Sequence, residues 1–206
     1  MKHRNVVVIS TMVGSALVLS ACTGNRTAPT TSSTPPASTN SAAAVPNNGA
    51  PKVENPLPAK ALDGSPCDSA LTTAQLKQFL GDTTVPKTSD DTLGTTCSWS
   101  STSGSGAGFA IAYQTKSDQG ISLAYKNVQP KAARWQVLDA VQGYPAVAYS
   151  DFDDKRHCVV VVGISDELAY SVSLTIGDSA SAQGKDACTL APKTADAVMT
   201  NLRQRA

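Results

Sequence analysis

Four residues near the start of the chain have the types and order that direct lipid attachment to a cysteine. Leu19-Ser20-Ala21-Cys22 closes an apolar stretch that follows the basic start Met1-Lys2-His3-Arg4. A signal peptidase that cleaves before a lipidated cysteine needs a branched apolar residue three positions earlier, two small residues and the thiol. The sequence therefore predicts thioether attachment of diacylglycerol to Cys22 and cleavage before it, which makes Cys22 the new amino terminus.

The apolar stretch itself is short. It runs from Val6 to Leu19 with polar interruptions, whereas a helix that spans a membrane needs about 20 apolar residues. We therefore expect residues 1–21 to be a cleaved lipoprotein signal peptide. Two or three acyl chains, at about 0.8 kcal/mol per buried methylene, would hold the protein on the outer face of the cell membrane. The alternative is an ordinary export signal followed by an incidental thiol at Cys22.

The remaining four cysteines form an even set, Cys67, Cys97, Cys158 and Cys188. Even sets in exported chains are typical of disulfides, and four thiols allow three pairings. The equal spacing of 30 residues favours the pairs Cys67–Cys97 and Cys158–Cys188. A zinc site is disfavoured because no two of these cysteines are close in the chain, and a redox pair is disfavoured because Cys-x-x-Cys is absent.

His157 is the one histidine after the predicted cleavage site, so any histidine-based catalysis would have to use it. Neither a Gly-x-Ser-x-Gly elbow nor a Ser-x-x-Lys motif accompanies it. Because it abuts Cys158, we interpret it as a strand-edge residue beside a disulfide. The sequence predicts no catalytic residue, although a hydrolase or transferase site assembled from distant residues is the alternative.

Two further segments resemble ligand sites weakly. Asp151, Asp153 and Asp154 could bind calcium but lack the spacing and final glutamate of an EF-hand, so a solvated turn explains them better. The run Gly104-Ser105-Gly106-Ala107-Gly108 resembles a phosphate loop but lacks the following Lys-Ser/Thr, so we expect a hairpin tip. No metal and no cofactor are predicted.

Four aromatic residues could line a ligand groove, although aromatic residues in strands more often belong to the core. They are Trp99, Tyr125, Trp135 and Tyr144.

Charge excludes some partners. The full chain has 17 basic and 16 acidic residues, and removal of Lys2 and Arg4 with the signal peptide leaves a formal net charge of minus one. Because Lys and Arg are not clustered, neither nucleic acid nor an anionic lipid surface is a predicted electrostatic partner.

Composition divides the processed chain at about residue 65. Residues 22–65 are rich in Thr, Ser, Pro and Ala, which predicts a disordered tether. Residues 66–206 are long enough for a single extracytoplasmic domain.

Periodicity within this domain predicts an α+β fold with a mainly antiparallel sheet and about three helices packed on it, stapled by two disulfides. A capping box at Thr72 to Gln75 begins a helix that ends near Leu80. A carboxy-terminal helix should cover the sheet, and Pro192 is tolerable there if it sits in the first turn. The remaining expected elements are a hairpin from Cys97 to Tyr113, a helix over 119–128, strands over 135–138 and 147–149, a central strand over 158–164 and an alternating strand over 170–176.

These residues together resemble actinobacterial lipoproteins that share the domain of unknown function 3558. The similarity is carried by the lipobox and by Pro66-Cys67, Leu71-Thr72, Leu80-Gly81, Cys97-Ser98-Trp99, Gly143-Tyr144-Pro145-Ala146, Cys158, Cys188, Ala195 and Asn201-Leu202. The resemblance implies an envelope lipoprotein and carries over no catalytic residue. We therefore expect a lipid-anchored, non-catalytic domain that binds an envelope protein, glycan or lipid through its sheet face or loops.

Overall fold

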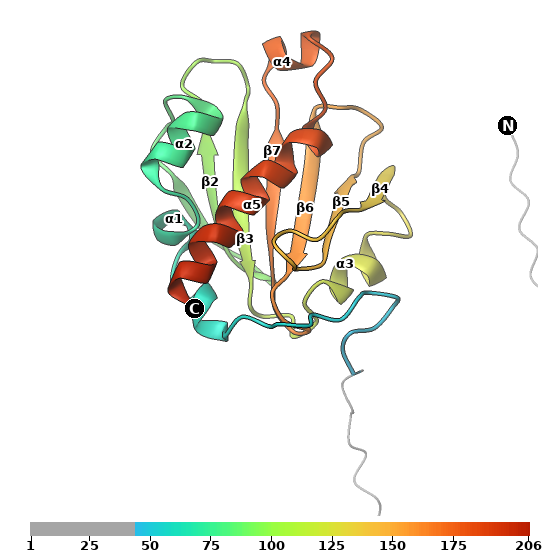
Figure 1. The fold of residues 1–206 in the computed structure, drawn as a ribbon. Coiled ribbons are helices and arrows are strands. Elements are labelled where there is room, and N and C mark those ends of the chain that lie inside the picture. The colour runs from blue at the N-terminus through green and yellow to red at the C-terminus, as the bar shows by residue number, and fades with distance from the viewer. Residues whose placement is uncertain (1–43) are drawn as a thin grey trace, which may run out of the picture. The chain divides into compact units, whose positions relative to one another are not determined.

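The structure is a computed structural model that describes residues 44–206, so the predicted lipobox and Cys22 lie outside the described residues. Within this part the chain forms one antiparallel sheet of seven strands, in the order β1-β2-β3-β7-β6-β5-β4, with helices packed on it (Figure 1). The strands are β1 (Lys87–Asp90), β2 (Gly94–Ser100), β3 (Gly108–Gln114), β4 (Arg134–Val137), β5 (Ala146–Ser150), β6 (His157–Gly163) and β7 (Ala169–Thr175).

Five α-helices and one 3-10 helix (Ala59–Leu62) accompany this sheet in residues 44–206. The α-helices are α1 (Pro66–Ser69), α2 (Thr73–Leu80), α3 (Ser122–Asn127), α4 (Asp178–Ala182) and α5 (Ala187–Arg205). The α+β class is confirmed, but the predicted count of about three helices is wrong. The additional helices α1 and α4 have four and five residues, too few for an apolar period to repeat.

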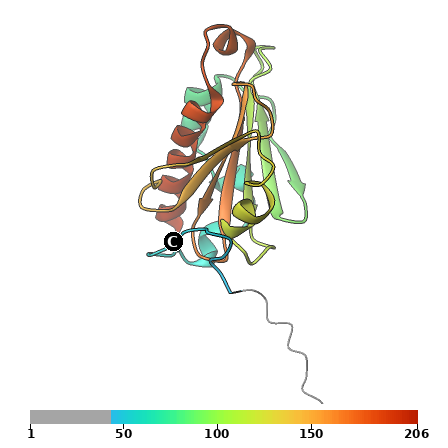
Figure 2. The same cartoon turned by 90° about the vertical axis from the view of Figure 1, so that its right-hand side faces the viewer.

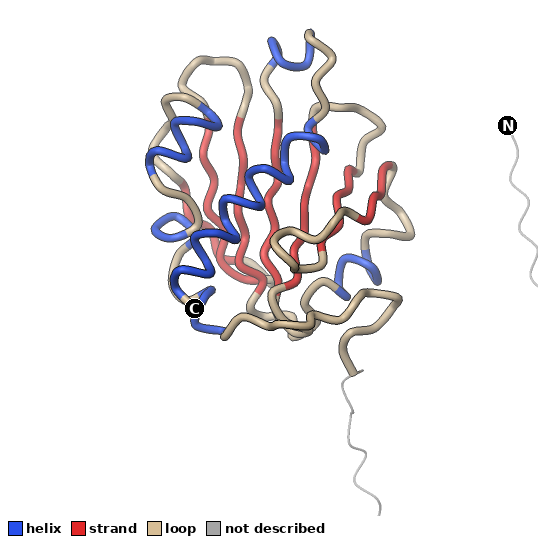
Figure 3. Tube along the Cα trace, viewed as in Figure 1, coloured by secondary structure: helices blue, strands red, loops and turns tan. Residues whose placement is uncertain are grey.

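Most of the predicted elements are present (Figure 3). The capping box of α2 is confirmed, because Thr72 accepts a hydrogen bond from the Gln75 amide and Gln75 accepts one from the Thr72 amide. The hairpin is confirmed as β2 and β3. The valine run forms β6, an interior strand, whereas β7 is the middle strand of the sheet. Strand β1 escapes the sequence pattern because all four of its residues are exposed.

Pro192 is not in the first turn of its helix. The helix begins at Ala187, capped by the Asp186 side chain, which accepts a hydrogen bond from the Cys188 amide at 2.8 Å. This cap places Pro192 in the second turn, where its missing N–H leaves the carbonyl of Cys188 without the usual helical donor. The predicted carboxy-terminal helix is present, but it starts about one turn earlier than the apolar period suggests, so Pro192 does not sit in its first turn.

The predicted tether boundary at residue 65 is also too late. Val53 and Leu62 are each 3% exposed and belong to the core, and the Leu57 amide donates a hydrogen bond to the Ile164 carbonyl. These few apolar side chains are enough to dock a segment whose composition is otherwise typical of disorder. The part of the predicted tether before residue 44 lies outside the described residues.

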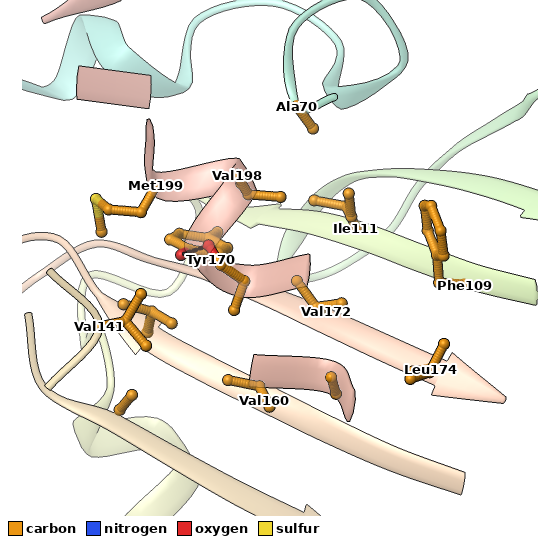
Figure 4. Packing of buried hydrophobic residues seen from close by; sticks show 14 of the residues in the cluster. Ala70, Phe109, Ile111, Val141, Val160, Tyr170, Val172, Leu174, Val198 and Met199 are labelled. Carbon is orange, nitrogen blue, oxygen red and sulfur yellow. Dashed lines mark hydrogen bonds between the residues drawn. The ribbon is translucent and has the colours of Figure 1, made fainter. Parts of the chain in front are cut away.

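The sheet has two different faces. One face packs against α1, α2 and α5, and its largest buried side chains include Ile111, Tyr170 and Met199 (Figure 4). On the other face, α3 covers a smaller cluster that includes Tyr125, Val147 and Val161. Figure 2 shows α5 on one side of the sheet and α3 by its lower end. The two faces therefore differ in how completely helices cover them.

None of the helices between residues 44 and 206 has the length and apolar content needed to cross a membrane.

Candidate functional site

The four cysteines after Cys22 form the two disulfides that their spacing predicts, Cys67–Cys97 and Cys158–Cys188. The first joins α1 to β2, and the second joins β6 to α5. The Cα atoms of the pairs are 5.1 and 5.0 Å apart, within the range usual for disulfides. These four cysteines are structural and hold neither a metal nor a reactive thiol.

His157 lies beside a serine of the neighbouring strand. The Nε2 atom of His157, on β6, is 2.9 Å from the Oγ atom of Ser173, on β7. Both side chains are half-buried. In the register of β6 and β7, His157 lies opposite Thr175 and Ser173 lies opposite Val159, so His157 and Ser173 share one face of the sheet, the face opposite α5. A serine hydroxyl that contacts an imidazole nitrogen is half of the arrangement that activates a nucleophile.

The other half of this arrangement is missing from residues 44–206. The Nδ1 atom of His157 is buried and has no hydrogen-bond partner there. In hydrolytic triads a carboxylate accepts a hydrogen bond from this nitrogen and fixes the imidazole ring. Here the nearest aromatic neighbour is Phe152, whose ring centroid is 6.3 Å away in an edge-on arrangement.

The three aspartates before His157 lie in an exposed turn. Asp154 accepts a hydrogen bond from the Arg156 amide through Oδ1 and another from the Arg134 guanidinium through its carbonyl. These contacts fix the turn rather than a ligand. No group of three His, Cys, Asp or Glu side chains within residues 44–206 is placed to hold a metal ion.

The face of the sheet opposite α5 has an uncovered half, which we call the open sheet face. It lies on β2, β3 and β7, where side chains alternate between the core and this face. All of its members are small and half-buried, and several carry a hydroxyl group. They are Thr96, Ser98, Ala110, Ala112, Ser171 and Ser173.

A pocket of about 320 Å³ lies at one end of the open sheet face. It is bounded by the turn between β2 and β3 and by the end of β7, and Ser98, Gly108 and Ser173 are among its lining residues. The glycine run is therefore the hairpin tip that the sequence predicts, and it borders this pocket. The hydroxyl of Ser173 belongs to both the pocket and the contact with His157.

The aromatic residues considered as a groove lining belong mainly to the core. Trp99 is 2% exposed and packs against Phe109 at 5.5 Å between ring centroids. Tyr125 of α3 packs edge-on against Trp135 of β4, with 5.2 Å between the ring centroids. Tyr144 is also buried. These rings stabilise the fold, and Trp99 also borders the pocket at the end of the open sheet face.

The strongest charged contact among the described residues joins the sheet to the beginning of α5. Arg134 donates to both carboxylate oxygens of Asp186, at 2.6 and 3.2 Å. Burial alone would raise the pKa of Asp186, but the hydrogen bonds from Arg134 and from the Cys188 amide outweigh it and lower that pKa. Arg134 and Asp186 thus act as a structural clamp.

Tyr170 is a large side chain with a hydroxyl group and is completely buried in the core. Its hydroxyl donates a 2.7 Å hydrogen bond to the Ala195 carbonyl of α5. Burial raises the pKa of this tyrosine well above its ordinary value. It stays neutral at physiological pH and positions α5 over β7.

Sequence reasoning missed Ser173 as the partner of His157. The alternation of Ser171, Ser173 and Thr175 with apolar residues indicates a wet strand face, which is correct. What the sequence does not show is that β7 pairs with β6 in the register that brings Ser173 next to His157. Hydrophobic alternation determines the face but not which strand lies alongside.

Comparison with known proteins gives a family and no further relative. No curated protein and no solved structure matches the chain. The family described as "Protein of unknown function (DUF3558)" matches residues 17–201, a range that includes Cys22 and all four disulfide cysteines. Because the match covers most of the sequence, the chain belongs to the DUF3558 family.

Proposed function

We propose that this protein is a lipid-anchored, non-catalytic binding protein on the outer face of the cell membrane, with the open sheet face as its binding surface. The observation that carries the binding assignment is the uncovered half of the sheet on β2, β3 and β7. In residues 44–206, α1, α2 and α5 pack on one face, while α3 packs on Val147, Val161 and Ala169 of the other. The small side chains of β2, β3 and β7 leave a flat surface.

The chemistry of the open sheet face suits a flat macromolecular surface. Ser98, Ser171 and Thr96 can each donate and accept hydrogen bonds, while Ala110 and Ala112 provide apolar area between them. Short side chains lose little conformational entropy when a partner covers them. An envelope protein, a glycan or a lipid headgroup layer could make such contacts, and the experiment below distinguishes them.

The location part of the proposal rests on the residues before the described region and on the disulfides. Leu19-Ser20-Ala21-Cys22 supports lipidation, and two disulfides support an oxidising compartment outside the cytosol.

Site-specific photocrosslinking in living cells tests the binding surface. Ala112 is replaced by p-benzoylphenylalanine, and the matched control carries the same residue at Asp196, which is exposed on α5. We expect a discrete crosslinked product from position 112 that position 196 does not give, and its mass and sensitivity to protease or glycosidase would identify the partner class. The same products from both positions, or none from position 112, would contradict the assignment. A product of twice the chain's mass would instead indicate self-association and would also overturn it.

A hydrolase is the second candidate function, favoured by the 2.9 Å contact between His157 and Ser173. In this case Ser173 would be the nucleophile and His157 the base, with the adjoining pocket holding the substrate. The missing partner of Nδ1 is the reason we place this function second.

A further inference from the structure

A second pocket is lined by residues of α2, α4 and the first half of α5 and by the end of β7. We call it the α2–α5 pocket. Its volume is about 300 Å³, and it shares Ala107 and Thr175 with the pocket at the end of the open sheet face. Its lining residues are Gln78, Phe79, Leu80, Ala107, Leu174, Thr175, Ile176, Gly177, Ala180, Lys185, Leu190, Lys193 and Thr194.

The interior of the α2–α5 pocket is mostly apolar. Phe79 comes from α2, Ile176 follows β7, and Leu190 comes from α5, so three separate elements converge on one hydrophobic lining. Phe79 and Leu190 are half-buried, so part of their apolar surface stays accessible within the pocket. An apolar ligand that fills the pocket would remove this surface from water, which favours binding.

Two lysines lie among the lining residues, and both are exposed. Lys185 precedes α5 and Lys193 lies in its second turn. In residues 44–206 neither ammonium group forms an ion pair, whereas nearby Asp178 and Asp186 are held by Arg156 and Arg134. The pocket thus combines an apolar interior with two cations that have no carboxylate of their own.

We propose that the α2–α5 pocket binds a single-chain anionic amphiphile of the fatty-acid type. The apolar chain occupies the interior, and the carboxylate lies between the Lys185 and Lys193 ammonium groups. A pocket of about 300 Å³ is small enough to favour one apolar chain over two, so a single-chain amphiphile is the ligand class. This inference does not depend on the open sheet face or on lipidation of Cys22.

Calorimetric titration with decanoate and with 1-decanol, both below the concentrations at which they aggregate, tests the proposal. The protein is the full chain carrying Cys22→Ala, purified without detergent so that no other amphiphile competes. We expect saturable binding of decanoate at one site, with an affinity at least ten-fold higher than that of decanol. Equal affinity for both, or no saturable binding of decanoate, would overturn the proposal.

Variants locate the site. The double variant Lys185→Gln/Lys193→Gln should weaken decanoate binding about ten-fold and leave decanol binding unchanged, because two partly screened charges are removed. The matched control is Lys126→Gln/Lys131→Gln, which removes two exposed lysines near α3 and should change neither affinity.

A third variant tests the interior. Ala180→Trp places a large ring in the pocket and should abolish binding of both compounds, whereas circular dichroism should show the same fold. If decanoate binds this variant with unchanged affinity, the ligand occupies another place and the proposal is wrong.

Discussion

Arg134 on the edge strand β4 holds Asp186, the N-cap of α5, through two hydrogen bonds that cross 52 residues of sequence. The same carboxylate accepts a hydrogen bond from the Cys188 amide, so one side chain both begins the helix and fastens it to the sheet. Cys188 itself is bonded to Cys158 of β6. The beginning of α5 is therefore fixed by an ion pair, a capping hydrogen bond and a disulfide within three residues.

Removal of this carboxylate should destabilise the domain. Asp186→Ala loses the helix cap and leaves Arg134 unpaired, so the free energy of unfolding should fall by about 1–3 kcal/mol. Asp186→Asn keeps an acceptor for the Cys188 amide and should lose less. Urea unfolding followed by circular dichroism measures both, and equal stability of Asp186→Ala and the parent would contradict the clamp.

The same carboxylate should make stability depend on acid pH. Its pKa in the folded state is lowered below the value of about 3.9 in unfolded chains. Its contribution is therefore complete above the unfolded pKa and is lost as pH falls through the folded pKa. The stability difference between the parent and Asp186→Asn should be largest near pH 7 and shrink below about pH 4. A difference that stays constant from pH 7 to pH 2 would rule out this source of stability.

The proposed lipidation of Cys22 predicts the cellular location of a Cys22→Ala variant. Cys22→Ala should either be released into the medium or accumulate as an uncleaved precursor, because the lipid anchor cannot form. Cell fractionation and intact mass spectrometry distinguish these fates, and the parent should carry two or three acyl chains. A mature Cys22→Ala protein that stays in the membrane fraction would exclude lipid as the anchor.

The hydrolase alternative has a sharp test. A fluorophosphonate probe reacts with activated serines, so the proposed binding protein should not be labelled above the level of Ser173→Ala. Ser171→Ala, two residues along the same strand face, is the matched control. Labelling that disappears in Ser173→Ala and in His157→Gln but persists in Ser171→Ala would establish a catalytic serine and replace the proposed function.

The disulfides should contribute a large share of the stability. Each closes a loop of about 30 residues, which on the chain-entropy estimate stabilises the domain by about 3–4 kcal/mol. Cys158→Ala/Cys188→Ala should lower the urea midpoint strongly while the Cys67–Cys97 peptide stays intact in a non-reducing map. A map that joins Cys67 to Cys158 or Cys188 would contradict the pairing.

How far the sequence predicts the fold depends on how local each signal is. The capping box of α2 could be predicted because both of its hydrogen bonds join residues three positions apart, and the structure confirms it. The alternation of apolar and polar side chains in β7 could be predicted because a period of two is visible within seven residues, and the structure confirms it. Strand β1 is exposed throughout and carries no such period, so only its pairing with β2 makes it a strand.

The site is less predictable than the fold for the same reason. The contact between His157 and Ser173 depends on the register of β6 against β7, and the α2–α5 pocket depends on helices separated by more than 100 residues. The docking of Val53 and Leu62 likewise needs the finished core. For this reason a prediction from composition alone assigns Val53 and Leu62 to the tether instead of the domain.

The position of β7 in the middle of the sheet determines when the chain can complete its fold during synthesis. Strands β1 to β3 and β4 to β6 are two groups of sequence neighbours, and β7 pairs with β3 on one side and β6 on the other. Until β7 has emerged, β3 presents an unpaired edge, and such edges recruit strands of other chains. The long-range pairing of β3 with β7 also slows folding. The chain is thus most prone to aggregation during the interval between emergence of β3 and arrival of β7.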